Sequence, residues 1–204
     1  MIAYKGFTKD IVSVMGNGKK ECCTFELGKK YLESECKTGR NGFHCCENPF
    51  GCISYYSLNG TNRFFKVEAG GNINEDESEK IACTELTLLE ELTQMQLALE
   101  GMKYIVEHPE REKWEQNLGK VIVKRDQAES QENGIAIARG MNPIIKGPVG
   151  SILGLIVEDA TGIVNCKLFI ANEKTADKWC KLTEERKVEV ITDEAEAGGK
   201  DKSN

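Results

Sequence analysis

The sequence predicts an α+β fold. A small mixed or antiparallel sheet forms the N-terminal domain, one long helix follows, and the C-terminal region is β-rich, with roll and hairpin elements. Three observations predict this. Short apolar segments between glycine-containing turns fill the first 86 residues. Apolar residues then recur with helical spacing from Leu88 onward. Beyond residue 120, small residues and isoleucines alternate between glycine or asparagine corners.

The first part of the chain predicts short strands. Residues 2–7 fit a strand that ends near a glycine, and residues 8–20 form a polar connection with a turn signal at Gly16-Asn17-Gly18. Residues 21–27 and the Tyr31-Leu32 segment fit two further strands.

A strand-to-helix unit follows. Residues 39–42 predict a turn, and Phe43–Cys46 predict a strand. Asn48 suits the capping position of a helix because its side chain can accept a bond from a free amide of the first turn. Pro49 suits the first helical position, so we expect a helix that runs to about Tyr56.

The next segment contains the longest periodic pattern. We expect a strand at 63–69, an acidic loop at 70–79 and a strand at 81–87. A helix is then predicted up to His108-Pro109. Its apolar residues are spaced four and three apart, close to a heptad: Leu88, Leu92, Met95, Leu99, Met102 and Val106. Such a seam is typical either of a helix packed on a sheet or of a self-association helix.

The C-terminal region predicts β-structure. Val121–Val123 fit a strand, and residues 132–140 suggest a tight β-roll or repeated turn. Two apolar segments, 147–157 and 163–170, flank the turn 158–162 and predict a hairpin. Two short strands are expected at 179–182 and 187–191.

These elements predict four parts of the chain: an α+β domain at 1–86, a helical connector or oligomerisation helix at 87–120, a β-rich domain at 121–192 and a disordered tail at 193–204.

Composition excludes some classes of protein. The net charge of −6 argues against a duplex nucleic-acid binder that works by bulk electrostatics. No apolar run approaches the roughly 20 residues of a spanning helix, so no membrane is expected. The N-terminal residues lack the pattern of a signal peptide, and we expect a cytoplasmic protein.

The nine cysteines are interpreted mainly as reduced, half-buried small hydrophobic residues. Zinc is the alternative, with His44, Cys45, Cys46, Cys22, Cys23 and Cys36 as the available ligands. No Cys-x-x-Cys knuckle is present, and adjacent cysteines on a strand point to opposite faces, so no metal site is predicted.

Three segments of the N-terminal domain are expected to converge: Tyr4-Lys5-Gly6, Gly42-Phe43-His44, and Tyr55 or Tyr56. A lysine pairs with phosphate, an aromatic ring stacks on a flat ring, and glycines allow close backbone approach, so this set suits a nucleotide. The alternatives are a core histidine bonded to the backbone and a tyrosine pair that belongs to the core and its rim.

The chain resembles a domain family found in phage and prophage proteins. The resemblance rests on Tyr-Lys-Gly-Phe at 4–7, Phe-Glu-x-Gly-Lys-x-Tyr at 25–31, the Asn-Gly-Phe-His and Cys-Glu-Asn-Pro segments within 41–49, the tyrosines at 55–56, and Arg-Phe-x-x-Val at 63–67. It implies a phage-encoded protein in the host cell cytoplasm and leaves the activity open.

The spacing of Gly42, Cys52 and Tyr55 is also similar to that in poly-ADP-ribose-polymerase-like transferases. This resemblance implies a stacking tyrosine at Tyr55. Lys5, His44 and Cys52 stand where that family has a histidine, a tyrosine and a serine. Glu85 is the best-placed counterpart of the catalytic glutamate, which orients the ribose and stabilises the oxocarbenium charge.

Three functions follow as hypotheses. The first is an accessory protein without catalysis or cofactor that binds NAD or a related nucleotide and sequesters a signalling nucleotide of host defence. Its ligand-binding residues are Tyr4, Lys5, Gly6, Phe43, His44, Cys52, Tyr55 and Tyr56. The second is an ADP-ribosyltransferase with an altered catalytic set. The third is a structural or interaction protein that forms a dimer or trimer through helix 88–106 and the β-rich region.

Overall fold

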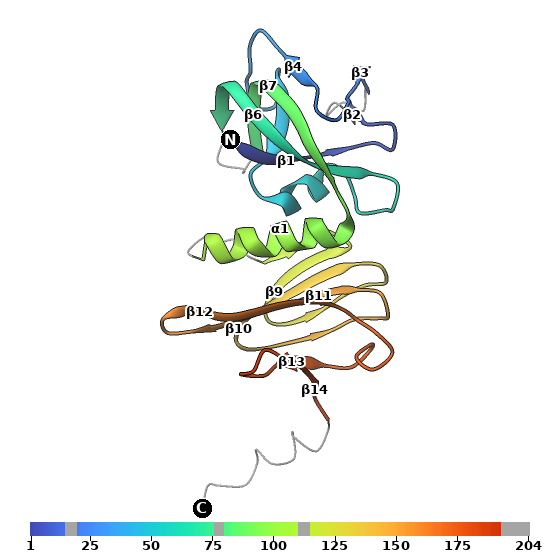
Figure 1. Cartoon of the computed structure of the whole chain (residues 1–204), viewed down its shortest axis with the longest axis vertical. Coiled ribbons are helices and arrows are strands. Elements are labelled where there is room, and N and C mark those ends of the chain that lie inside the picture. The colour runs from blue at the N-terminus through green and yellow to red at the C-terminus, as the bar shows by residue number, and fades with distance from the viewer. Residues whose placement is uncertain (15–19, 76–79, 110–114, 193–204) are drawn as a thin grey trace, which may run out of the picture. The chain divides into compact units, whose positions relative to one another are not determined.

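The computed structural model describes residues 1–14, 20–75, 80–109 and 115–192, with residues 20–23 described by their backbone alone (Figure 1). The chain forms two compact units, Met1–Glu107 and His108–Asn204. Within the described residues, both units are dominated by β-strands, and one α-helix is present. The turn predicted at 16–18 and the tail predicted at 193–204 lie outside the described residues.

The described residues of the N-terminal unit form seven strands, a 3-10 helix and an α-helix. They are β1 Ile2–Phe7, β2 Val12–Val14, β3 Lys20–Thr24, β4 Lys30–Leu32, β5 Phe43–Cys46, η1 Pro49–Ser54, β6 Arg63–Glu75, β7 Lys80–Leu92 and α1 Gln94–Glu107. The strands expected at 2–7, 31–32 and 43–46 are therefore confirmed.

Four antiparallel strands of this unit pair in a closed cycle. β1 pairs with β5 and β6, and β7 pairs with β5 and β6. β4 pairs with Glu85–Thr87 of β7, next to the stretch that pairs with β5. Side chains from one face of these strands, among them Ala3, Phe7, Cys45 and Phe65, form a buried cluster with Phe25. This cluster therefore lies on one face of the paired strands, and buried residues of η1 and α1, among them Phe50 and Leu97, form a further part of the core.

The long β6–β7 pairing corrects two expectations. The acidic loop predicted from residue 70 is wrong over 70–75, because β6 continues to Glu75 across a bulge at Gly70–Ile73. Gly71 has a φ of +68° there, and the Asn72 amide donates to Thr84 Oγ1 at 2.9 Å. The helix predicted from Leu88 is also wrong over its first turns, because Leu88 and Leu92 belong to β7.

Helix α1 begins after a capping box. The Thr93 amide donates to Gln96 Oε1 at 2.9 Å, and the Gln96 amide donates to Thr93 Oγ1 at 3.2 Å. This reciprocal pair satisfies two amide groups at the helix start. The predicted heptad seam does not form one buried stripe, because Leu99 is 55% exposed while Leu97, Gly101 and Ile105 are buried.

In the part of the C-terminal unit that the structure describes there are seven strands: β8 Gln116–Asn117, β9 Val121–Glu129, β10 Ile135–Lys146, β11 Ile152–Asp159, β12 Gly162–Ile170, β13 Cys180–Leu182 and β14 Val188–Val190. β11 and β12 form the predicted antiparallel hairpin. β13 and β14 form a second, short hairpin. The strands expected at 121–123, 163–170, 179–182 and 187–191 are thus confirmed, and the strand expected over 147–157 begins only at Ile152.

The first three long strands of this unit stack as parallel coils. Val121, Ile135 and Ile152 occupy equivalent positions in the parallel pairs β9–β10 and β10–β11. Only a few residues separate successive strands, so the chain turns back at once to begin the next layer. This is the roll expected from residues 132–140, and it extends through β11.

Candidate functional site

The clearest surface feature of the N-terminal unit is the contact between Tyr55 and Lys80. Tyr55 is the capping residue that follows η1, and 54% of its surface is exposed. The Lys80 ammonium lies 4.9 Å from the centre of its ring. Lys80 begins β7 and pairs in register with Cys46 of β5. An aromatic face and a cation therefore meet where η1 and the start of β7 come together.

The position of Tyr55 follows from the local sequence. Asn48 caps η1, and its side chain accepts a hydrogen bond from the Phe50 amide at 3.0 Å. Pro49 opens the helix, as the sequence predicts, but the helix is of the 3-10 type and ends at Ser54. The Tyr55 and Tyr56 amides both donate to the Cys52 carbonyl. These bonds fix the direction in which the two tyrosines leave the helix.

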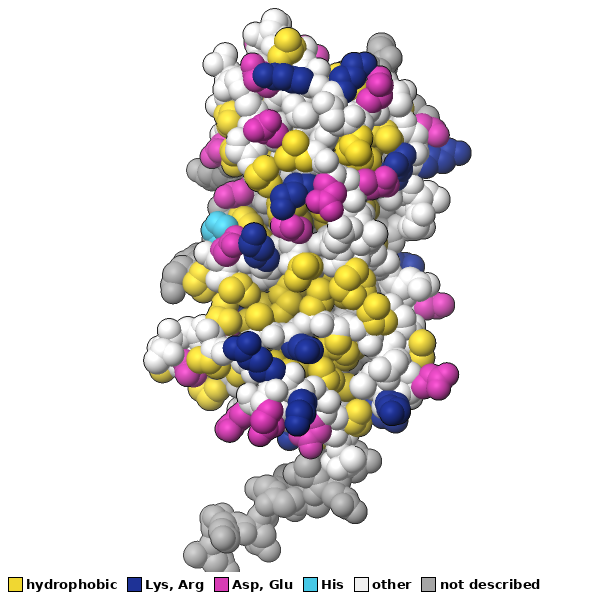
Figure 2. Space-filling model, in the orientation of Figure 1, with side chains coloured by type: hydrophobic (Ala, Val, Ile, Leu, Met, Phe, Trp, Pro, Cys, Tyr) yellow, Lys and Arg dark blue, Asp and Glu magenta, His cyan; other side chains and the backbone are white. Residues whose placement is uncertain are grey.

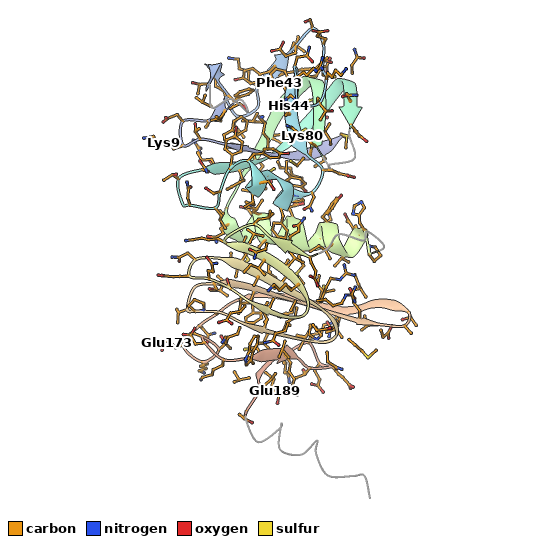
Figure 3. All side chains as sticks on the ribbon, turned by 180° about the vertical axis from the view of Figure 1, so that it is seen from behind. Lys9, Phe43, His44, Lys80, Glu173 and Glu189 are labelled. Carbon is orange, nitrogen blue, oxygen red and sulfur yellow. The ribbon has the colours of Figure 1, made fainter. Side chains whose placement is uncertain are left out.

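His44 lies near Lys80 on the same face of the β5–β7 pair (Figure 3). Its Nε2 accepts a hydrogen bond from the Gly39 amide at 2.9 Å. Burial, together with Lys80 and Lys5, lowers the pKa of His44 below the ordinary value for histidine. The imidazole is therefore neutral at pH 7 and holds the 39–42 turn against β5.

Lys5 is the main buried charge of this unit, with 5% of its surface exposed. Its ammonium donates to the His44 carbonyl oxygen at 2.7 Å and to Ser13 Oγ at 3.2 Å, and it lies 5.2 Å from the centre of the Phe7 ring. These contacts are internal. Lys5 therefore joins β1, β2 and β5.

The neighbours of Lys5 on β1 also have structural contacts. Tyr4 donates to Glu100 Oε2 of α1 at 2.6 Å, and Lys66 donates to Glu100 Oε1 at 3.0 Å. Burial and the Glu100 carboxylate raise the pKa of Tyr4 well above its ordinary value. Although burial opposes it, these two hydrogen bonds lower the pKa of Glu100. The two hydrogen bonds to Glu100 therefore link α1 to β1 and β6.

Gly6, Phe43 and Tyr56 belong to the packing of the unit. A Cβ on Gly6 would lie 2.5 Å from Tyr56 Cδ2, so the ring occupies the space a side chain would need. Tyr56 is buried and its hydroxyl accepts from the Val14 amide at 2.8 Å. Phe43 is buried against the rings of Phe25 and Tyr31.

Cys45, Cys46, Cys52 and Cys83 are buried thiols, and Cys36 is partly exposed. Burial raises the pKa of Cys52, with a further contribution from Cys46, and a hydrogen bond with Cys83 raises the pKa of Cys45. These two thiols stay protonated at neutral pH, so they are poor nucleophiles and poor metal ligands. Within the described part of the chain, no three His, Cys, Asp or Glu residues are placed to hold a metal ion. The side chains of Cys22 and Cys23 lie outside that part.

Glu85 lies in a different environment from Tyr55 and Lys80. Its carboxylate forms an ion pair with Lys30 of β4 at 2.6 Å and lies beside the Gly70-Gly71 bulge of β6. The structure therefore places Glu85 on the β4 side of β7, whereas Tyr55 contacts the residue at which β7 begins.

The structure thus brings His44 and Tyr55 to the region of Lys80 and assigns internal contacts to Tyr4, Lys5, Gly6, Phe43, Cys52 and Tyr56. Sequence reasoning missed Lys80 and Ser13. A signal for the burial of Lys5 was present, because Lys5 alternates with Ala3 and Phe7, which both belong to the core.

Comparison with known proteins agrees with the division into two units. The family model described as a domain of unknown function, DUF7666, matches residues 1–100, which run from β1 into α1. No curated protein and no solved structure matches the chain. No described helix is long and apolar enough to cross a membrane.

Proposed function

We propose that the N-terminal unit binds a nucleotide-like ligand, with a flat ring stacked on Tyr55 and a phosphate held by Lys80. One observation carries the proposal: an exposed tyrosine ring and a lysine ammonium lie 4.9 Å apart on the surface. Ring stacking and charge pairing are the two interactions by which proteins hold nucleotides without reading an exact sequence.

A second lysine–tyrosine contact in the same unit shows why Lys80 is the better anion partner. Lys29 lies 5.4 Å from the centre of the Tyr31 ring, but its ammonium is already neutralised by Glu26 at 2.7 Å. Lys80 forms no ion pair with a carboxylate among the described residues. Its charge is therefore available to a phosphate.

His44 supports this surface indirectly. Its Nε2 is occupied by the Gly39 amide, so it positions the 39–42 turn and does not offer that nitrogen to a ligand. Glu85 is engaged by Lys30. The two contacts that define this surface, a ring and a lysine, supply stacking and charge pairing, so the proposal is binding without catalysis. Such a protein would act by sequestering its ligand, the counter-defence role that the phage-like sequence pattern implies.

Titration calorimetry with NAD, ADP-ribose and cyclic dinucleotides tests the proposal. We expect heat with at least one of them, and a loss of about 1–3 kcal/mol in binding free energy for Tyr55→Ala. Lys80→Gln weakens binding of the phosphate, whereas Lys29→Gln, the matched lysine–tyrosine pair, leaves it unchanged. The proposal fails if the folded protein gives no heat with any of these compounds, or if Tyr55→Ala binds as tightly as the natural protein.

Incubation with labelled NAD separates binding from transfer. We expect no covalent label on the chain or on proteins of a cell lysate. Transfer that disappears in Glu85→Gln would instead assign the transferase activity.

A further inference from the structure

The adjacent cysteines of β5, Cys45 and Cys46, point to opposite faces of the sheet because successive residues of a strand alternate. Cys45 forms a side-chain hydrogen bond with Cys83 of β7, and Cys46 forms one with Cys52 of η1. All four side chains are buried. Two pairs of thiols therefore lie on the two sides of β5, and the pair of Cys45 with Cys83 belongs to the core cluster.

The pairing of β5 with β7 sets Cys45 beside Cys83. Phe43 lies in register with Cys83, and Cys45 lies in register with Ile81, so the two cysteines are diagonal neighbours on antiparallel strands. Both side chains belong to the same buried cluster. The Cys83 sulfur also lies 3.5 Å from the Phe43 carbonyl oxygen. The register of two strands, and not a loop, therefore brings the two thiols together.

The surroundings of Cys83 favour its thiolate form. The Cys45 thiol donates a hydrogen bond to the Cys83 sulfur, and the backbone at Gly70 and Glu85 donates further ones. These contacts lower the pKa of Cys83 below the ordinary value for cysteine, although burial opposes them. Cys45 has the opposite shift, because donating this hydrogen bond raises its pKa. Cys83 is therefore the better nucleophile of the pair, and Cys45 is the proton donor.

Lys5 supplies a positive charge to the same core. Its ammonium lies 5.2 Å from the centre of the Phe7 ring, and Phe7 belongs to the cluster that holds both cysteines. Its hydrogen bonds go to neutral groups, Ser13 Oγ and the His44 carbonyl oxygen. After the thiol hydrogen bond, this charge is a further cause of the lowered pKa of Cys83. An ammonium near a thiol is one of the features that make cysteines reactive.

Cys83 lies beside the bulge of β6. Its side chain is 0% exposed, so it is no part of the molecular surface, whose viewed face in this unit carries charged side chains of both signs with hydrophobic ones between them (Figure 2). Its sulfur contacts the backbone of Gly70, where the ladder of β6 with β7 is interrupted between Gly70 and Ile73. A strand opens locally with least cost where its ladder is interrupted. The site therefore suits an oxidant little larger than water, such as hydrogen peroxide.

We propose that Cys83 and Cys45 are a peroxide-reactive pair, with Cys83 as the nucleophile and Cys45 as the resolving thiol. The Cys83 thiolate attacks one oxygen of hydrogen peroxide, so an S–O bond forms, the O–O bond breaks, and the leaving hydroxide takes a proton to become water. Cys83 is then a sulfenic acid. The Cys45 sulfur attacks it, an S–S bond replaces the S–O bond, and a second water leaves. The two thiols have lost two hydrogens, and one peroxide has become two waters.

Oxidation of Cys83 also activates Cys45. The hydrogen bond to Cys83 is the first cause of the raised pKa of Cys45, so loss of the Cys83 thiolate lets Cys45 ionise and attack. Diagonal neighbours have Cα atoms about 7–8 Å apart, whereas a disulfide needs about 4.4–6.8 Å. Closure of the disulfide therefore draws β5 and β7 together. A disulfide closed in this way is readily reduced, which makes the oxidation reversible.

Peptide mapping tests the pair. The folded chain is treated with equimolar hydrogen peroxide, its remaining thiols are blocked in denaturant, and it is digested with trypsin without reduction. Trypsin leaves Cys45 in peptide 41–63 and Cys83 in peptide 81–103. We expect these two peptides to be joined, with a mass two hydrogens below their sum. Treatment with dithiothreitol before digestion separates them.

Single variants assign the roles. Cys83→Ser is expected to remove the link and the consumption of peroxide that accompanies it. Cys45→Ser leaves the sulfenic acid on Cys83 without a resolving thiol, so dimedone labels it. Cys46→Ser is the matched control at the next position of β5 and keeps the link. Circular dichroism checks that each variant is folded.

The pH dependence of the reaction tests the part of Lys5. Lys5→Met removes the charge and keeps an unbranched side chain. The pH at which Cys83 reacts with peroxide at half its maximal rate is expected to rise, because the thiolate loses a stabilising cation. An unchanged midpoint in the folded variant would show that Lys5 does not stabilise the thiolate.

Three outcomes would overturn the peroxide-reactive pair. The first is a folded chain whose two peptides stay separate under excess peroxide. The second is a link between these peptides that survives in Cys45→Ser. The third is dimedone labelling of Cys180, a buried thiol of the C-terminal unit, as fast as that of Cys83, because the reaction would then not depend on the surroundings of Cys83.

Discussion

The ring of Tyr56 lies against the backbone of Gly6. A Cβ on Gly6 would come within 2.5 to 2.8 Å of three atoms of the tyrosine, Cδ2, Cγ and Cβ. The contact joins β1 to the second residue after η1, and the buried Tyr56 hydroxyl accepts a hydrogen bond from the Val14 amide. The segment that carries Tyr55 is therefore anchored through its neighbour.

The first prediction concerns this contact. Gly6→Ala is expected to lower the free energy of unfolding by about 1–3 kcal/mol, because a methyl group at this position overlaps the ring. Urea unfolding measures the change. Tyr56→Phe keeps the ring, so the cost of Gly6→Ala persists in that background. In the Tyr56→Ala background, Gly6→Ala is expected to lower the unfolding free energy by less. An unchanged loss in that background would show that the tyrosine ring is not its cause.

The second prediction is the pH dependence of stability from His44. Its folded pKa is lowered, so protons bind more tightly to the unfolded chain. The contribution to stability is therefore full above the unfolded pKa of about 6.5 and is lost as the pH falls through the folded pKa. Unfolding free energies across this range should fall more in the natural protein than in His44→Gln. If the unfolding free energy changes equally with pH in the natural protein and in His44→Gln, the assignment to His44 is refuted.

The third prediction concerns the start of α1. Thr93→Ala removes the hydroxyl that accepts the Gln96 amide and should cost about 0.5–2 kcal/mol of stability. Thr93→Ser retains the hydroxyl and serves as the control, with most of the stability kept. Thermal unfolding with both variants is the measurement, and equal melting temperatures for Ala and Ser would argue against the cap.

The fourth prediction concerns the corners of the parallel coils. Gly119, Asn133 and Gly150 each precede the start of a layer by two residues, and their φ angles are +70°, +52° and +84°. A Cβ on Gly150 would meet no atom within 4 Å. The cost of Gly150→Ala therefore comes from the backbone alone and is expected to be about 1–2 kcal/mol. Asn133→Gly keeps the left-handed conformation accessible and should be tolerated. Chemical denaturation followed by circular dichroism compares them.

Local patterns in the sequence predicted most of the strands, because alternation and glycine turns act over a few residues. The boundary between β7 and α1 was missed for a physical reason. Leu88 and Leu92 are four residues apart, a spacing that fits a helix, and the β7 bulge that sets Leu88 opposite Val67 and Leu92 opposite Phe64, on different faces of the sheet, has no local sequence signal. The Thr93–Gln96 capping box was the signal that places the helix start after Leu92.

The candidate site was predicted less completely than the fold. The pair Tyr55 and Lys80 brings together residues from η1 and β7, and only the pairing of β5 with β7 sets Lys80 beside the end of η1. Lys5 was expected at the surface because lysine is seldom fully buried. Its burial depends on acceptors from two other strands, the His44 carbonyl and Ser13, and no local pattern reveals them.

The closed cycle of strands in the N-terminal unit also has a kinetic consequence. Ile2 pairs with Glu68, so β1 is synthesised well before the strand it joins. Until β6 is made and folded beside it, the edges of β1 and β5 have no complete set of partners. Contacts between residues so distant in the sequence slow folding, because a long loop must close before any bond forms. Ring closure by β1 is therefore expected to be a late step, and chaperone demand should be greatest during it.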